Sequence, residues 1–271
     1  MEGMLVLGAG YLGKKIKDYF SAESCDSMIH SKKDVEHIIK AYTKNGKKPV
    51  IFNCIGATGT DNIDWCEKNK EETFKSNVLV PAYIAEVCKG AGIYMVHLGT
   101  GCIYSGDNNG KGFSEDDAPN FAKSYYSITK TAAETLLKNL NVLQLRLRMP
   151  IDNDDSHKNL INKLLKYDEI VEGKNSITVI PDFLSIAEEL INKRLTGVFN
   201  VVNNPPLTNM EILGIYSKVT GIKIEKKEIS YKEMRKLTKA ERAICTLSTE
   251  KLEKYVKISD SRKSLENLFK V

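Results

Sequence analysis

Short apolar runs alternate with amphipathic segments along the first 150 residues of the chain. The apolar runs are Met4–Leu7, Val50–Ile55, Tyr94–Leu98 and Val142–Leu147. Runs of this length are typical of strands that are buried on both faces of a parallel sheet. The segments 14–20, 78–88 and 125–140 read as helices. This alternation predicts an α/β fold with a Rossmann-type, doubly wound parallel sheet.

The pattern loosens after Pro150 and returns as two strands with a helix between them, at about 176–180 and 197–202. We therefore expect two domains. The cofactor-binding domain is predicted over 1–150 plus about 176–202, and a small C-terminal substrate-binding lobe over about 151–175 and 203–271.

The composition is that of an ordinary water-soluble protein, with 42% hydrophobic and 28% charged residues among 271. No run is long enough to span a membrane, and we expect no signal peptide before the first strand. The six cysteines form no Cys-x-x-Cys pair and have no metal-ligand spacing with the four histidines. The sequence therefore predicts reduced thiols in a cytoplasmic protein without a metal site.

The net charge of +5 comes mainly from scattered lysines. The basic run from Lys223 to Lys239 is interrupted by Glu225, Glu228 and Glu233. This mixture favours a solvated helix face over a nucleic-acid surface.

Gly8-Ala-Gly10-Tyr-Leu-Gly13 follows the first predicted strand and opens a helix. Glycines at these positions allow a tight turn and close approach of a pyrophosphate, and the helix N-terminus offers unpaired N–H groups to that anion. The alternative is a flexible N-terminal turn. The order strand, glycine turn, helix favours a dinucleotide site formed by Gly8, Gly10, Tyr11, Leu12 and Gly13.

Cofactor choice is predicted from the next strand, expected at Asp26–His30. NAD sites usually carry an acidic residue at the end of this strand, whereas this chain has Ser31, Lys32 and Lys33. A hydroxyl and two cations suit a 2′-phosphate, which favours NADPH over NADH. The alternative is that the lysines are a solvated prelude to a helix capped by Asp34.

Tyr126 and Lys130 stand four residues apart on a predicted helix, after Thr100. Reduction of a ketone needs a proton donor at the carbonyl oxygen, and a free tyrosine, with a pKa near ~10, holds its proton tightly. A lysine on the same helix face favours the phenolate and lowers that pKa. Thr100 would place a second hydroxyl on the carbonyl oxygen. These residues predict a carbonyl reductase.

Several further motifs resemble one family, the extended short-chain dehydrogenase/reductases that complete nucleotide-rhamnose synthesis. They are Asn53 with Gly56-Ala-Thr-Gly59, Asn62-Ile-Asp-Trp65-Cys66-Glu67, Ser76-Asn77-Val78, Thr100-Gly-Cys102-Ile-Tyr, Gly112-Phe-Ser-Glu-Asp-Asp-Ala-Pro-Asn120, Tyr126 to Lys130 and Arg146-Leu-Arg-Met-Pro-Ile151. The likeness is to the 3,5-epimerase/4-reductase half of plant rhamnose synthases, which act on UDP-4-keto-6-deoxyglucose. It spans at least residues 50–215.

The resemblance implies hydride transfer from NADPH to a 4-keto sugar, with Tyr126 as proton donor and Lys130 also binding the nicotinamide ribose. The implied cofactor-binding residues, with those above, are Asn53, Gly56, Ala57, Asn77, Tyr126, Lys130 and Pro150. The implied substrate-binding residues are Thr58, Thr100, Cys102, Asn159 and Lys163. For Asn77, a structural or proton-relay role competes with a simple helix-packing hydrogen bond.

Epimerisation at C3 and C5 requires a base on one face of the sugar and an acid on the other. Cys102 lies where related GDP-fucose synthases carry a cysteine, and it would act as the base if Lys130 or a neighbouring cation favours its thiolate. The alternative is that Cys102 is a small buried packing residue with no catalytic role. For the second group we favour Lys163, with Lys158 and His157 as alternatives and a salt contact with the diphosphate as the competing role for Lys163.

The preferred function is thus an NADPH-dependent conversion of UDP-4-keto-6-deoxy-D-glucose to UDP-L-rhamnose. The alternatives are a monofunctional dTDP-4-dehydrorhamnose reductase and a non-catalytic regulatory subunit of the same fold. The sequence leaves open the choice between UDP and dTDP. It also leaves open the oligomeric state, for which a homodimer packing its long helices would fit. We expect a small-molecule substrate, and neither nucleic acid nor membrane as a partner.

Overall fold

The computed structural model describes residues 3–43, 46–59 and 62–270. The chain divides into two compact units. Unit 1 comprises Met1–Gly99, Tyr125–Leu145 and Ile191–Val198, and unit 2 comprises Thr100–Ser124, Arg146–Leu190 and Phe199–Val271. The functional division predicted from the sequence, into a cofactor-binding and a substrate-binding part, stays a prediction.

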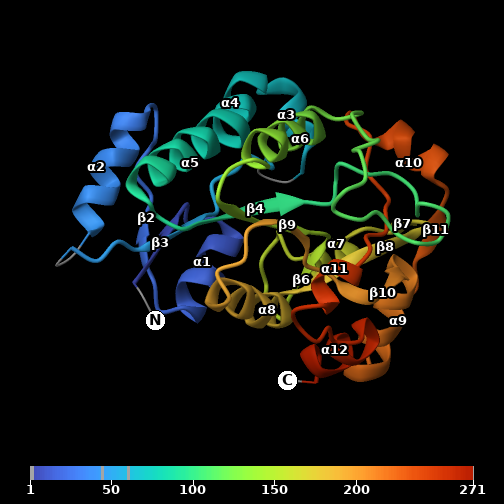
Figure 1. Ribbon diagram of the computed structural model, residues 1–271. Coiled ribbons are helices and arrows are strands. Elements are labelled where there is room, and N and C mark those ends of the chain that lie inside the picture. Colours follow the sequence, from blue (N-terminus) through green and yellow to red (C-terminus); the bar gives the residue numbers. More distant parts are fainter. Residues whose placement is uncertain (1–2, 44–45, 60–61, 271) are drawn as a thin grey trace. The chain divides into compact units, whose positions relative to one another are not determined.

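Unit 1 is built on a six-stranded sheet with the order β2-β1-β3-β4-β5-β9 (Figure 1). Its strands are β1 (Met4–Leu7), β2 (Glu23–Cys25), β3 (Val50–Asn53), β4 (Met95–Thr100), β5 (Val142–Leu147) and β9 (Gly197–Asn200). The pairs β1–β2, β1–β3 and β3–β4 are parallel. The last residues of β4, β5 and β9 belong to unit 2.

Helices lie on both faces of this sheet (Figure 1). They are α1 (Tyr11–Tyr19), α2 (Lys32–Tyr42), α3 (Asp64–Lys68), α4 (Lys70–Phe74), the π-helical η1 (Lys75–Leu79), α5 (Val80–Ala91) and α6 (Tyr125–Leu137). Val35 of α2, Ile84 of α5 and Leu137 of α6 share one hydrophobic core with the strands, and α1 covers the other face. The doubly wound α/β fold predicted from the sequence is confirmed.

The second strand is shorter and earlier than the sequence predicted. We expected it at Asp26–His30, but β2 covers Glu23–Cys25 and the following residues form no strand. The physical reason is that β2 is an edge strand, paired only with β1, and only Cys25 is buried. An edge strand lacks the continuous apolar run that marks the central strands.

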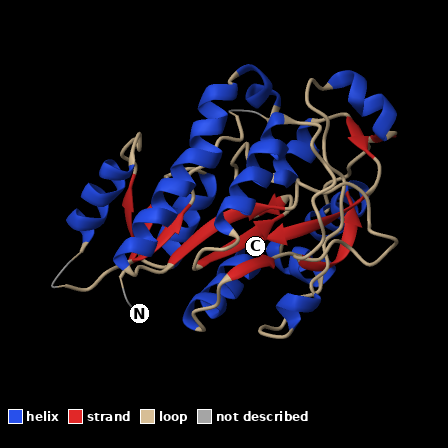
Figure 2. Cartoon of the chain, turned by 45° about the horizontal axis from the view of Figure 1, so that its top comes forward, coloured by secondary structure: helices blue, strands red, loops and turns tan. Residues whose placement is uncertain are grey.

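Unit 2 contains two small sheets together with several helices (Figure 2). Its elements are β6 (Pro150–Ile151), α7 (Leu160–Lys166), β7 (Glu169–Val171), β8 (Lys174–Val179), α8 (Ile180–Asn192, ending in unit 1), β10 (Asn203–Thr208), α9 (Asn209–Thr220), β11 (Lys227–Ile229), α10 (Tyr231–Leu237), α11 (Glu250–Glu253) and α12 (Ser261–Leu268). The sheets have the orders β10-β8-β6 and β11-β7. Ile177 of β8, Ile212 of α9 and Leu265 of α12 share its core.

The basic run at 223–239 is not one helix, as predicted, but β11 followed by α10. Its lysines are solvated and pair with acids: Lys227 bonds Glu169 at 2.8 Å and Lys223 bonds Glu225 at 2.7 Å. These ion pairs agree with the expected solvated surface, and the preference against a nucleic-acid surface stays a prediction. The single helix was wrong because β11 pairs with β7 across a long sequence separation that no local pattern encodes. Within the described parts of the chain, no helix is both long and apolar enough to cross a membrane.

Candidate active site

The glycine turn at Gly8–Gly13 joins the carboxyl end of β1 to α1, all within unit 1. Gly8 has φ +97°, and a Cβ there would lie 3.0 Å from atoms of Ile55. A Cβ on Gly13 would lie 1.9 Å from the Gly8 carbonyl oxygen, so this close packing of helix on turn requires glycine. A Cβ on Gly10, by contrast, meets nothing within 4 Å.

The turn therefore fits a dinucleotide phosphate. Gly10 is exposed at the N-terminus of α1, and its missing side chain leaves open space in front of the backbone N–H groups. This is where a pyrophosphate would approach, because the first N–H groups of a helix lack partners within the helix. Tyr11 and Leu12 form the first turn of α1.

Ser31 and Lys32 stand at the N-terminus of α2. Ser31 caps this helix: its backbone N and Oγ both bond Asp34 Oδ2, at 2.9 and 3.2 Å. Hydrogen bonds from backbone N–H groups, above all that of His30, hold the pKa of the Asp34 carboxyl below its ordinary value. Lys32 forms an ion pair with Glu86 of α5. The helix cap that we considered as the alternative is therefore present, although with Ser31 as the capping residue.

Asn53 ends β3 and is fully buried. Its Oδ1 accepts from the backbone N of Ile55 at 3.0 Å, so its Nδ2 faces His97 and donates to Nδ1 at 3.0 Å. Burial, reinforced by the charge of Lys130, holds the pKa of His97 well below its ordinary value. His97 is therefore neutral, and Asn53 fixes the turn that follows β3.

Asn77 clips three segments of unit 1 together. Its Oδ1 accepts from the backbone N of Ala57 at 2.7 Å, and its Nδ2 donates to the Ala57 carbonyl oxygen and to Thr129 Oγ1, both at 3.1 Å. Gly56 lies close beside it, and a Cβ there would make a tight contact of 3.3 Å with Asn77 Oδ1. Asn77 lies in η1, and single π-helical turns are frequent at functional sites. These hydrogen bonds favour a structural role for Asn77 over a role as a proton relay.

Tyr126 and Lys130 lie one turn apart on α6, and both are buried. Lys130 Nζ donates a hydrogen bond of 2.8 Å to the Leu98 carbonyl oxygen of β4. Because residues i and i+4 share a helix face, this bond holds the ammonium on the face that carries Tyr126. The start of α6 is held by Glu67, whose Oε1 accepts from the backbone N of Tyr125 at 2.6 Å.

Thr100 and Cys102 lie in unit 2, at and just beyond the end of β4. Thr100 Oγ1 accepts from the backbone N of Cys102 at 3.1 Å. The hydroxyl accepts here and so keeps its own hydrogen to donate. Cys102 is half-buried, whereas most other cysteines of the chain are buried.

Arg148 follows β5 and points its guanidinium at the Cys102 thiol. Arg148 Nη1 donates to Cys102 Sγ at 3.1 Å, and Nη2 donates to Asn175 Oδ1 at 2.5 Å and to the Ala243 carbonyl oxygen. The arginine is 7% exposed. The base role considered for Cys102 required Lys130 or a neighbouring cation, and within unit 2 Arg148 is a cation that contacts the thiol.

The other predicted residues of unit 2 lie after β5. Pro150 opens β6, following Met149 with φ +44°. Asn159 is fully buried: its Oδ1 accepts from the backbone N of Asp152 at 3.1 Å, and its Nδ2 donates to the Asp152 carbonyl oxygen at 2.6 Å. It thus holds the loop before α7, which carries half-buried Lys163. His157 is exposed.

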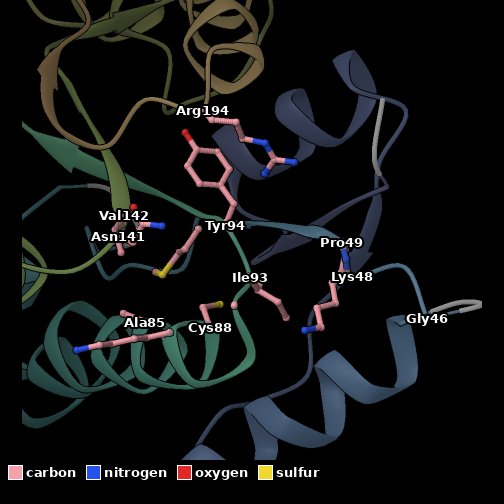
Figure 3. Close-up of a pocket in the computed structure, with 13 residues that line it drawn as sticks. Gly46, Lys48, Pro49, Ala85, Cys88, Ile93, Tyr94, Asn141, Val142 and Arg194 are labelled. Atoms are coloured by element: carbon pink, nitrogen blue, oxygen red, sulfur yellow. The ribbon is translucent and has the colours of Figure 1, made fainter.

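A cavity of about 790 Å³ lies elsewhere in unit 1, beside Lys48, Tyr94 and Arg194 (Figure 3). Its lining includes Lys48, Tyr94 and Asn141, which directly precede β3, β4 and β5 or lie within two residues of them, so it opens at the amino ends of these strands. Ligands of open α/β sheets bind beyond the carboxyl ends. We therefore assign the chemistry to the opposite edge, where Gly8, Asn53 and Leu98 lie.

The doubly wound sheet with this glycine turn places the protein among the Rossmann-type dinucleotide-binding folds. More narrowly, the chain belongs to the family described as RmlD substrate binding domain, whose model matches residues 1–186. This membership confirms the resemblance found in the sequence and the expectation of an enzyme.

Three relatives are informative. A bifunctional dTDP-4-dehydrorhamnose 3,5-epimerase/dTDP-4-dehydrorhamnose reductase of Arabidopsis thaliana is 37% identical over 221 residues, which are 79% of this chain and 73% of the relative. The crystal structure of the L780 UDP-rhamnose synthase from Acanthamoeba polyphaga mimivirus has a TM-score of 0.89 with 26% identity over 99% of both chains. A dTDP-4-dehydrorhamnose reductase of Bacillus anthracis in complex with NADP has a TM-score of 0.84 with 19% identity, over 99% of this chain and 98% of that one.

The structure brings the predicted residues together in two groups. In unit 1 the glycine turn, Asn53, Asn77 and the α6 pair stand at the carboxyl edge of one sheet, and exposed Thr58 follows β3. In unit 2 Thr100 and Cys102 lie in one turn. Sequence reasoning gave no role to Arg148, although a charged residue flanked by apolar ones at the end of a buried strand was a signal for it.

Proposed function

We propose that this protein is an NADPH-dependent 3,5-epimerase/4-reductase that converts UDP-4-keto-6-deoxy-D-glucose to UDP-L-rhamnose. The observation that carries the proposal is the Lys130–Leu98 hydrogen bond, which fixes a cation on the helix face of Tyr126. That arrangement is what a tuned proton donor for a ketone requires. Family membership and the dual activity printed for the Arabidopsis relative support it.

In this proposal the cofactor lies along the carboxyl edge of the unit 1 sheet. The pyrophosphate faces Gly10 and the N-terminus of α1, and Asn77 keeps Gly56 and Ala57 in place beside it. Ser31 and Lys32 bind the 2′-phosphate, which requires Lys32 to leave Glu86. Exposed ion pairs contribute only about 0–1 kcal/mol, so this exchange is easy. NADPH, when bound, supplies the hydride, and the NADP complex of the Bacillus anthracis relative agrees with this choice.

The chain's own residues handle the protons. Tyr126 donates its phenolic proton to the C4 oxygen while Thr100 donates a hydrogen bond to the same atom. Lys130 stabilises the phenolate that remains. Pro150 shapes the nicotinamide pocket.

For epimerisation, Cys102 removes the proton next to the ketone and Lys163 returns one from the opposite face. The half-buried position of the thiol beside Arg148 supports its reactivity. Asn159 contributes by holding the loop that leads to Lys163. Thr58 contacts the substrate from the loop after β3.

The test is turnover without a second enzyme. Supplied with UDP-4-keto-6-deoxyglucose and NADPH, the protein should consume the cofactor and release UDP-rhamnose, identified by NMR. The dTDP analogue is run beside it, and the faster substrate identifies the nucleotide. Consumption of NADPH only after addition of a separate epimerase would indicate a simple reductase, and no consumption with either nucleotide would contradict the reductase assignment.

A further inference from the structure

The guanidinium of Arg148 is held in one orientation within unit 2. Its Nη2 is shared between Asn175 Oδ1 and the Ala243 carbonyl oxygen, while its backbone N donates to Thr178 Oγ1 at 3.1 Å. Asn175 is itself fixed, because its Oδ1 also accepts from the backbone N of Cys245 at 3.1 Å. Nη1 is left aimed at Cys102 Sγ.

The segment that contributes Ala243 is tied to the loop that contains Cys102. Gly106 and Phe113 form bridges with Cys245 and Leu247, and the backbone N of Ser176 donates to the Cys245 carbonyl oxygen at 3.1 Å. On the other side, Cys245 Sγ donates to the Gly101 carbonyl oxygen at 3.2 Å. Residues 243–248 therefore brace the arginine and the cysteine turn together.

The donor and acceptor roles in this contact are fixed by chemistry. A guanidinium has only N–H donors and stays charged, so the sulfur must accept. A thiol is a weak acceptor, whereas a thiolate forms a charge-assisted hydrogen bond of roughly twice the strength of a neutral one. Of the three acceptors described for Nη1 and Nη2, only the sulfur can become an anion. A buried cation gains from that anion as a partner.

We propose that Arg148 is a positioning residue that holds Cys102 as the thiolate base for epimerisation. The inference rests on the proposed function. In the step, the Cys102 sulfur takes the proton from the carbon beside the ketone. The C–H bond breaks and its electron pair passes to the enolate, while a lone pair of the thiolate forms the new S–H bond. Lys163 then donates a proton to that carbon from the other face. No electron leaves the substrate, so this step needs no oxidant.

The second thiol of this region does not compete for the role. Cys245 is 1% exposed, and burial raises the pKa of its thiol to about 11, against the opposing effect of Arg148. The charged and titratable groups described around the pair are Arg148 and Arg146 at the end of β5 and Cys245 in the 243–248 segment. Cys245 therefore stays protonated at neutral pH.

The test compares Arg148→Gln, Arg148→Lys and the control Arg146→Gln. Arg146 is an equally buried arginine of β5 whose Nη1 bonds Ser114 and Asn200, so its loss reports the general cost of removing a buried guanidinium. Two quantities are measured: deuterium incorporation at C3 and C5 in deuterated water, and the pH dependence of Cys102 alkylation by iodoacetamide, followed by peptide mass spectrometry.

Arg148→Gln should lower deuterium incorporation at neutral pH by about tenfold to a hundredfold and move the alkylation midpoint up by about one pH unit or more. Arg148→Lys should recover part of the deuterium incorporation and part of the midpoint, because lysine restores the positive charge without the planar set of guanidinium donors. Arg146→Gln should move the midpoint less than Arg148→Gln does, because the described hydrogen bonds of Arg146 go to Ser114 and Asn200, whereas Arg148 donates directly to Cys102 Sγ. Reduction of substrate already epimerised should persist in Arg148→Gln, since that step needs no thiolate.

Unchanged incorporation and an unchanged midpoint in Arg148→Gln would overturn the inference. If that variant fails to fold, the wild-type protein decides: a Cys102 midpoint of about 8.5, that of a free cysteine, contradicts it. The proposed function fails separately: it is contradicted by a wild-type protein that places no deuterium at C3 or C5. Normal incorporation in a Cys102→Ser protein would instead contradict the base role of Cys102 and leave the reductase assignment standing.

Discussion

Single residues decide which proton moves. Tyr126 is buried on α6, and its neighbour Lys130 is anchored to β4 by the Leu98 carbonyl oxygen. The ring of Tyr126 contributes packing and its hydroxyl contributes the acid. A substitution that deletes only the oxygen separates the two contributions.

Tyr126→Phe should lower the rate of 4-keto reduction by on the order of a hundredfold or more, because it removes the acid and keeps the ring. The measurement is NADPH consumption with the keto sugar, and NADPH binding by fluorescence serves as the control. A variant that reduces at the wild-type rate would transfer the proton-donor role to another group.

The raised pKa of a buried thiol makes the free energy of unfolding depend on pH. Burial raises the pKa of Cys88 to about 12, above its ordinary 9.0. The folded state therefore holds this proton more tightly than the unfolded state does. The stabilisation is complete below pH 9 and is lost as pH rises from 9 towards 12.

Cys88→Ala should therefore weaken the fall in unfolding free energy between pH 9 and 11, measured by urea denaturation. Leu137→Ala opens a cavity in the same core without removing a titrating group, and it should keep the wild-type slope. Equal slopes in Cys88→Ala and wild type would show that this thiol does not titrate differently on unfolding.

At the scale of elements, the glycine turn offers a matched pair of substitutions. Gly10→Ala should fold normally yet bind NADPH about tenfold or more weakly, because its Cβ fills the open space where the pyrophosphate approaches. Gly13→Ala should destabilise the fold itself, since its Cβ would lie 1.9 Å from the Gly8 carbonyl oxygen. Thermal unfolding and cofactor titration of both variants distinguish the two effects. Full NADPH affinity in Gly10→Ala would contradict the cofactor placement.

The central strands were predictable because burial on both faces leaves a local signature. Val50–Asn53 and Val142–Leu147 are entirely buried and apolar enough to be recognised from composition alone. The edge strand β2 has one buried residue and was placed too late. The strands β7 and β11 pair across more than 50 residues, and no local pattern encodes that pairing.

The candidate site shows the same limit. Tyr126 and Lys130 are four residues apart, so helical spacing alone predicted that they share a face. Arg148, Asn175 and Ala243 meet only through tertiary structure, and the first and the last are 95 positions apart in the sequence. The sequence indicated only that Cys102 would need Lys130 or another cation beside it to act as a base, and the contact with Arg148 required the fold.

At the scale of the whole molecule, the two proposed reactions draw on different parts of the chain. Unit 1 carries most of the proposed cofactor residues and the pair Tyr126 and Lys130. Unit 2 carries Thr100, Pro150 and the proposed epimerisation residues, which are Cys102, Arg148 and Lys163. Reduction and epimerisation should therefore respond to different substitutions. The central claim is that one chain performs both reactions.

The most direct test of that claim is proton exchange in deuterated water. Incubated with UDP-4-keto-6-deoxyglucose and no other enzyme, the wild-type protein should place deuterium at both C3 and C5, because exchange requires deprotonation but no hydride. Cys102→Ser should suppress this incorporation while still binding NADPH. Both carbons keeping their protium with the wild-type protein would contradict the account.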